Sequence, residues 1–315
     1  MTLTIGVDVG GTKVAAGVVD LAGEVVAQTR RDTPADDVAK TRDVIVEAVA
    51  ELVAAHQVEA VGIGAAGWID ASRSTVLFAP NIAWRDEPLR DYVSEAVGLP
   101  VIVENDANAA AWAEFRFGAA RHADDSMIMF TIGTGVGGAI VFGGELVRGA
   151  HGIAAELGHM LSVPEGHLCG CGRHGCLEQY ASGNALVRFA RAGARQEPRR
   201  AAALLDLASG DAEEITGPMV TAAAKEGDPV SREAFAQIGH WLGIALADMV
   251  QILDPQILVV GGGVVEAGDL LLGPTQQSYV DALAQRGRIA VADLVPAQMG
   301  NAAGVVGAGD LARRR

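Results

Sequence analysis

The chain has 315 residues, half of them hydrophobic, and a formal net charge of −15 at pH 7. This length predicts two lobes with ample core material, and the charge would repel a phosphate backbone, so nucleic acid is excluded as a general partner. No apolar run reaches membrane-spanning length, and Asp8 comes too early for a signal peptide. We therefore expect a cytoplasmic protein with a small-molecule ligand and no membrane partner.

Two stretches of the chain share one plan, short β-branched runs separated by turns, at residues 2–31 and 127–148. Between them the pattern predicts a helix near 35–56, a strand at 58–67, an amphipathic segment at 88–97, a strand at 100–105 and a helix at 107–117. Later residues read mostly as Ala-rich helices, with a buried strand pattern at 257–265, a last helix near 302–314 and a mobile surface segment at 199–214. The duplication indicates two α/β lobes.

The first copy contains GVDVGGTK, in which a glycine pair lies at a strand–turn–strand junction. Gly10 and Gly11 can take φ > 0 and leave backbone N–H groups open to an anion, Thr12 and Lys13 add a hydroxyl and a cation, and Asp8 can hold Mg²⁺ through water. Alone, the motif is no more than a hairpin turn.

The second copy changes that interpretation, because TIGTGVGG repeats the logic. Two such turns predict a cradle for one polyphosphate, although neither is a P-loop or a dinucleotide fingerprint. A third cluster, in VVGGGV, suits the base or ribose of a nucleotide. The candidate residues are Thr131, Gly133, Thr134, Gly135, Gly137 and Gly138 in the second turn, and Gly261, Gly262 and Gly263 in the third cluster.

The stretch ENDANAAAW places Asn105 and Asp106 where a buried strand ends and a helix begins. Asp106 can simply cap the helix. A carboxylate there can also accept the proton of a substrate hydroxyl during phosphoryl transfer. The two roles are compatible.

All three cysteines of the chain lie within eight positions, in LCGCGRHGC. The odd count and close spacing disfavour a disulfide, and an iron–sulfur cluster would normally need a fourth cysteine. Cys169, Cys171 and Cys176 with His159 make a full tetrahedral zinc shell, and Glu156 lies three residues before that histidine. By spacing alone His151, His167 and His174 remain rival ligands.

Together DVGGTK, ENDANAA, TIGTGVGG, ELGH and CGCGRHGCLEQYASG resemble the ROK family of bacterial sugar kinases and repressors, over nearly the whole chain and most closely its actinobacterial glucokinases. The resemblance implies a two-domain, actin-like (ribonuclease H-like) α/β ATPase fold with sugar in the cleft. It implies domains at 1–118 plus 300–315 and at 119–299, and self-association into a dimer or tetramer.

The resemblance also implies phosphorylation of the glucose 6-hydroxyl by ATP with Mg²⁺, Asp106 as the base and a structural zinc on His159 and the cysteines. His151, His167 and His174 fall outside the family's ligand pattern. Ala66 precedes Gly67 where the family often has proline, which predicts a slightly different substrate loop. The residues implied to meet the sugar are Gly67, Asn81, Asn105, Asp106, Glu156, His159 and Glu178.

Three alternatives compete with a glucokinase. A kinase of another hexose, such as N-acetylmannosamine, shares most of these motifs, and Asn81 is the reason, by resemblance, to prefer glucose. A sugar-responsive ROK regulator would need a helix-turn-helix ahead of DVGGTK, where only seven residues precede Asp8. A non-catalytic sugar sensor would not require Asp106.

Overall fold

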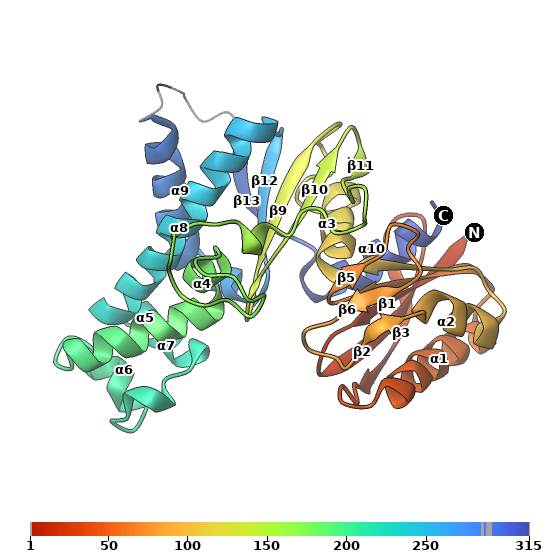
Figure 1. Cartoon of the computed structure of the whole chain (residues 1–315), viewed down its shortest axis with the longest axis horizontal. Helices are drawn as coiled ribbons and strands as arrows, with labels where there is room; N and C mark the ends of the chain where they lie inside the picture. The colour runs from red at the N-terminus through yellow and green to blue at the C-terminus, as the bar shows by residue number, and fades with distance from the viewer. Residues whose placement is uncertain (1, 285–286, 288–291, 315) are drawn as a thin grey trace. The chain divides into compact units, whose positions relative to one another are not determined.

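The computed structural model describes residues 2–284, 287 and 292–314 (Figure 1). The chain divides into two compact units. Unit 1 comprises Met1–Met127, Ala139–Ala155 and Ala297–Arg315, and unit 2 comprises Ile128–Gly138 and Glu156–Pro296. The expected domain boundaries at 118/119 and 299/300 remain a prediction.

A five-stranded sheet with the order β3-β2-β1-β4-β8 forms the centre of unit 1. β1 (Leu3–Val9), β2 (Lys13–Val19) and β3 (Val25–Asp32) are an antiparallel meander, which confirms the predicted strand–turn–strand motif. β4 (Val58–Ala65) and β8 (Val101–Asn105) then add parallel to β1, so their carboxyl ends share one edge of the sheet.

Four helices pack in unit 1: α1 (Val38–Ala55), α2 (Leu89–Val97), α3 (Asp106–Arg116) and α10 (Ala303–Ala312). A small sheet of β5 (Trp68–Ile69), β6 (Val76–Phe78) and β7 (Arg85–Glu87) completes it. α10 approaches the central sheet closely, because a Cβ at Gly6 or Gly62 would overlap its backbone. Glycines thus let a helix from the end of the chain lie against the first strand (Figure 1).

The second five-stranded sheet has the order β11-β10-β9-β12-β13. Its strands are β9 (Met127–Ile132), β10 (Val136–Phe142), β11 (Glu145–Leu146), β12 (Ile257–Gly261) and β13 (Asp293–Pro296). β10 and β11 are antiparallel, and β12 and β13 are parallel. The second copy of the sequence motif therefore also forms consecutive neighbouring strands, as predicted.

Unit 2 is otherwise mostly helical, and its long helices α8 (Pro229–Leu253) and α9 (Asp269–Ala284) lie side by side (Figure 1). Its other helices are α4 (Glu178–Ala181), α5 (Gly183–Gln196), α6 (Ala202–Leu207) and α7 (Gly217–Lys225). Four 3₁₀ turns occur in the described chain: η1 (Leu157–His159), η2 (Ala212–Glu214) and η3 (Gly263–Ala267) in unit 2, and η4 (Gly300–Ala302) in unit 1.

Residues 199–214, expected to be a mobile surface segment, are mostly exposed but include α6 and η2. Leu204 and Ala201 are fully buried in the helical core of unit 2, and Ala208 is nearly so. These small and aliphatic side chains hold the segment against the core. Among the described helices, none is both long and apolar enough to cross a membrane.

Candidate functional site

The junction between β8 and α3 positions the two polar residues of ENDANAA. Asn105 is the N-cap of α3: its Oδ1 accepts the backbone N–H of Asn108 at 3.0 Å, and its Nδ2 donates to the Gly67 carbonyl at 2.9 Å. The alternative that Asp106 caps the helix is therefore wrong. Asp106 is the first residue of the helix, where its Oδ1 accepts the N–H of Ala107 at 2.9 Å. Since the capping position is already filled, the Asp106 carboxylate keeps acceptor capacity for another partner.

Asp8 and Asp106 are neighbouring carboxylates in unit 1. Asp8 lies in β1 opposite Gly64, whose missing Cβ would be 3.8 Å from the Asp106 Cα. Burial raises the pKa of Asp8 to about 6, with the negative charge of Asp106 adding to the rise and Lys13 opposing it. Burial likewise raises the pKa of Asp106. Two acidic groups held in one poorly solvated place are typical of a site that binds a cation or moves a proton.

The turn between β1 and β2 presents the other predicted residues of the first motif. The N–H of Gly10 donates to the Lys13 carbonyl at 3.0 Å, and Thr12 and Lys13 are exposed. Contrary to the expectation, neither Gly10 nor Gly11 has a positive φ. The lack of space for a side chain accounts for glycine at position 11 instead, because a Cβ there would lie 3.1 Å from the Cβ of Asn81. Asn81 is exposed and is one of the residues predicted to contact the sugar.

A buried carboxylate behind Asn105 was not recognised in the sequence, although it stands in the quoted motif. Glu104 accepts the Asn105 backbone N–H and the Asn108 side chain through Oε1, and pairs with Arg148 at 2.6 Å and Arg73 at 3.4 Å through Oε2. Glu104 is 2% exposed. It therefore fixes the backbone just before Asp106 by contacts from two other loops of unit 1.

The turn between β9 and β10, the second glycine motif, is closed by the Gly133 N–H donating to the Gly135 carbonyl at 3.0 Å. Here too none of the four glycines has a positive φ. Two of them make room for neighbours: a Cβ at Gly135 would overlap the Glu178 carboxylate, and one at Gly138 would lie 2.5 Å from the Leu157 Cγ. Thr131 is the last residue but one of β9, Thr134 is exposed in the turn, and Gly137 lies in β10.

The four predicted zinc ligands come together in unit 2. The ligand atoms of His159, Cys169, Cys171 and Cys176 all lie within 4.8 Å of one another. The Sγ atoms of Cys171 and Cys176 are 3.6 Å apart, and Cys169 Sγ is 3.7 Å from His159 Nδ1. A tetrahedral zinc with metal–ligand bonds of about 2.0–2.3 Å needs ligand atoms about 3.5–3.8 Å apart.

The chemistry of the donor set also fits a cation. All three cysteines are free thiols, and burial, reinforced by the neighbouring thiols, raises the pKa of Cys176 to about 12. A divalent metal would supply the positive charge needed to hold these groups as thiolates. Among the rival ligands, His174 Nδ1 lies 2.9 Å from the Gly166 carbonyl oxygen, and the His167 ring packs against the Tyr180 ring at a tilt of 38°.

Two acidic residues flank this cluster. Glu156 is the N-cap of η1, and its carbonyl accepts the N–H of His159 at 3.0 Å. Glu178, the first residue of α4, accepts the Val136 N–H at 3.1 Å through Oε2, and its Oε1 lies 3.6 Å from Cys169 Sγ. Glu178 thus contacts both the cysteine cluster and the second glycine turn.

The third glycine cluster ends β12. Gly262 has φ +87°, and a Cβ there would overlap the backbone of Ile132 at the end of β9. Gly261 is buried, whereas Gly262 and Gly263 are exposed, and nothing lies within 4 Å of a Cβ at Gly263. The cluster combines a close strand-to-strand approach with an open backbone.

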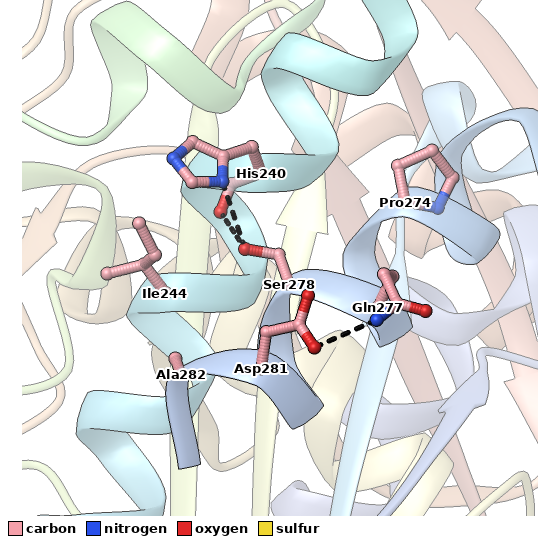
Figure 2. Close-up of a pocket in the computed structure, with 7 residues that line it drawn as sticks. All are labelled: His240, Ile244, Pro274, Gln277, Ser278, Asp281 and Ala282. Carbon is pink, nitrogen blue, oxygen red and sulfur yellow. Dashed lines mark hydrogen bonds between the residues drawn. The ribbon is translucent and has the colours of Figure 1, made fainter. Parts of the chain in front are cut away.

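A cavity of about 420 Å³ lies elsewhere in unit 2, between α8 and α9 (Figure 2). Its polar groups pair with each other: Ser278 Oγ donates to the His240 carbonyl at 2.9 Å, and Gln277 Nε2 to Asp281 Oδ1 at 2.9 Å. None of the predicted site residues lines it.

Comparison with known proteins gives a match to the ROK family over residues 4–315. The chain is 50% identical to a glucokinase of Streptomyces coelicolor, over 99% of this chain and 98% of that protein. It is 36% identical to an N-acetylmannosamine kinase of Yersinia pseudotuberculosis, over 82% of each. Among solved structures, a ROK family glucokinase from Streptomyces griseus in complex with glucose and AMPPNP is 51% identical, with a TM-score of 0.88, 99% of this chain and 100% of that chain being covered.

Proposed function

The chain belongs to the ROK family, and we propose that it is a glucokinase that transfers the γ-phosphoryl group of ATP to the 6-hydroxyl of glucose. The observation that carries this proposal is the pair of neighbouring carboxylates, Asp8 and Asp106, which lie near the carboxyl ends of β1 and β8. In phosphoryl transfer one carboxylate can accept a proton while another holds the cation that accompanies the nucleotide.

Asp106 is the proposed general base. As the sugar oxygen forms its bond to the γ-phosphorus and the bond to the ADP oxygen breaks, the hydroxyl proton passes to the Asp106 carboxylate. Burial raises its pKa, which makes the ionised group a stronger base than an exposed aspartate. Glu104 and Asn105 hold the backbone on either side of Asp106, because they accept the N–H groups of Asn105 and Asn108 respectively.

Each unit carries residues that are proposed to contact the sugar. In unit 1 the Asn105 side chain is tied to the Gly67 carbonyl, so the two predicted sugar contacts are fixed relative to each other. Asn81 is exposed beside Gly11. In unit 2 His159 belongs to the His/Cys cluster, Glu178 lies against Cys169, and the Glu156 carbonyl accepts the His159 N–H.

The two glycine turns are proposed to bind the phosphates of ATP, and the cluster at 261–263 its adenosine end. Backbone N–H groups in such turns make anion-binding concavities. Asp8 is proposed to hold Mg²⁺ through water, since its carboxylate lies in β1 just before the turn and the negative charge of Asp106 is close to it.

A structural zinc is proposed on His159, Cys169, Cys171 and Cys176, whose ligand atoms lie within 4.8 Å of one another and include two pairs at the 3.6–3.7 Å spacing of a tetrahedral site. Four protein ligands leave no open coordination position, so the metal braces the loop and supplies no Lewis acid to the reaction. Because Nδ1 faces the cysteine sulfur, Nε2 of His159 would be the nitrogen available to a sugar hydroxyl. A cytoplasmic location is a further proposal. Assembly as a dimer or tetramer is also proposed, because members of the family commonly self-associate.

A coupled assay with ATP and a panel of hexoses tests the proposal. We expect kcat/KM for glucose to exceed that for N-acetylmannosamine by at least about tenfold, or 1.4 kcal/mol of transition-state stabilisation. The reverse order would reassign the chain as a kinase of the acetylated sugar. Sugar binding without turnover would indicate a sensor or regulator.

A further inference from the structure

The second glycine turn is held in place by the segment that follows the last cysteine. Glu178 Oε2 accepts the Val136 N–H at 3.1 Å, and the N–H of Gly183, at the start of α5, donates to the Gly133 carbonyl at 2.8 Å. The N–H of Asn184 also reaches the Thr134 carbonyl, at 3.4 Å. Both ends of the turn are thus anchored to residues 178–184.

The absence of a side chain at Gly135 makes the central contact possible. A Cβ at this position would overlap the Glu178 carboxylate, with Oε2 as its nearest atom, although nothing in the backbone angles of Gly135 requires glycine. The Glu178 carboxylate thus accounts for the absence of a side chain at Gly135.

The same carboxylate lies next to the cysteine cluster and is connected to it through the backbone. Glu178 follows Cys176 by two residues, and its Oε1 lies 3.6 Å from Cys169 Sγ. The chain on either side of the cluster is paired as well: the Leu177 N–H donates to the Met160 carbonyl at 2.8 Å, and Leu161 forms a β-bridge with Cys176. The cysteine loop (residues 169–176), α4 and the second glycine turn thus form one continuous series of contacts within unit 2.

We propose that Glu178 is a positioning residue that couples the metal cluster to the nucleotide turn, so that zinc strengthens ATP binding even when no sugar is present. Ordered ligands fix the cysteine loop, the loop fixes the Glu178 carboxylate, and Glu178 sets the orientation of the Val136 peptide in the turn. The coupling is reciprocal, so bound nucleotide also tightens zinc binding. This inference rests on the proposed function, because it assumes that the β9–β10 turn binds phosphates.

The first test measures binding of Mg²⁺·AMPPNP by calorimetry without sugar, in zinc-loaded chain and in chain stripped with a chelator. We expect the dissociation constant to rise about tenfold on stripping, the effect of losing one hydrogen bond to a charged acceptor. Unchanged affinity in the stripped chain would overturn the coupling. No nucleotide binding by the loaded parent would overturn both the coupling and the proposed function, whereas normal glucose phosphorylation with zinc-independent nucleotide binding would overturn the coupling alone.

A second test uses zinc-loaded variants and keeps the proposal falsifiable if the stripped chain unfolds. Glu178→Ala should weaken AMPPNP binding about tenfold while zinc content stays at one per chain. Glu178→Gln keeps an acceptor oxygen for the Val136 N–H and should restore nucleotide affinity to within about threefold. Failure of Gln to recover affinity that Ala loses would contradict the positioning role.

The last arm is a double-mutant cycle between Gly135 and Glu178. Gly135→Ala displaces the carboxylate and should weaken AMPPNP binding about tenfold alone, yet add little in the Glu178→Ala background. Additive losses of about a hundredfold would show that Gly135 serves the phosphate directly. Gly273→Ala, in an exposed part of α9 where a Cβ meets nothing within 4 Å, is the matched control and should leave AMPPNP affinity unchanged.

Discussion

At the residue scale, the structure separates two roles that the motif ENDANAA had combined. Asn105 caps α3, and Asp106 occupies the first helical position with a raised pKa. The helix start and the reactive carboxylate are therefore carried by adjacent residues. Substitutions at Asp106 can test catalysis without removing the cap.

Asp106→Asn should lower kcat by at least about a hundredfold, because the amide oxygen is not basic enough to accept the hydroxyl proton. The variant should unfold at or above the parent's temperature, since Asn105 still caps the helix and a desolvated charge has been removed. Steady-state kinetics with glucose and ATP, beside a thermal melt, measures both. Turnover within a few-fold of the parent would exclude Asp106 as the base.

Asp8→Asn should raise stability at neutral pH in the absence of nucleotide and Mg²⁺. The folded-state pKa of Asp8 is raised to about 6, so the parent is most stabilised by this group below about pH 4, where both states are protonated, and loses that contribution as pH rises through 6. The variant's advantage should therefore grow by about 1–3 kcal/mol between pH 4 and pH 7.5.

Urea unfolding at the two pH values measures this difference, with exposed Asp36→Asn as the control. An advantage that is constant with pH would show that Asp8 is well solvated. The same variant should lose kinase activity, because it can no longer hold Mg²⁺ as a carboxylate does.

At the scale of elements, the packing of α10 on the first sheet depends on missing side chains. Gly6 in β1 and Gly62 in β4 are register partners, and a Cβ on either would overlap the backbone of α10. Gly304, at the start of the helix, lies so close to Asp8 that a Cβ would be 2.7 Å from its Cγ. The helix therefore both closes the core of unit 1 and limits the water around Asp8.

Gly62→Ala should destabilise the chain by about 2–3 kcal/mol, because the new methyl group forces α10 away from the sheet. Chemical denaturation measures the loss. The space-permitting substitution Gly273→Ala in α9 should instead be neutral or slightly stabilising. Equal stability of the two variants would mean that α10 shifts at no cost.

At the scale of the whole molecule, the zinc proposed on the cysteine cluster should make the stability of the protein depend on a metal. Freshly purified protein should contain one zinc per chain, and Cys171→Ser should reduce that content and the melting temperature together. Elemental analysis and a thermal melt with and without chelator provide the measurements. Full zinc content in the Ser variant would remove Cys171 from the ligand set.

Local features of the sequence were enough to predict several elements and the clustering of the three cysteines with His159. The β-branched runs gave the two strand–turn–strand motifs, because alternation and turn residues act over a few positions. The crowding of Cys169, Cys171 and Cys176 predicted a metal cluster, because residues so close in the chain can hardly avoid one another. The motif set indicated the family, which the match over residues 4–315 confirms.

Only the tertiary structure decided which long-range contacts explain the glycines and the acidic groups. The sequence suggested positive φ at Gly10, Gly11 and the second turn, whereas Gly11 leaves room for Asn81 and Gly135 for Glu178, 43 residues away. The Arg73–Glu104–Arg148 pairing and the burial that raises the pKa of Asp8 arise the same way. Each depends on residues that are far apart in the chain and meet only in the folded structure. A local sequence pattern does not show which distant residues will be in contact.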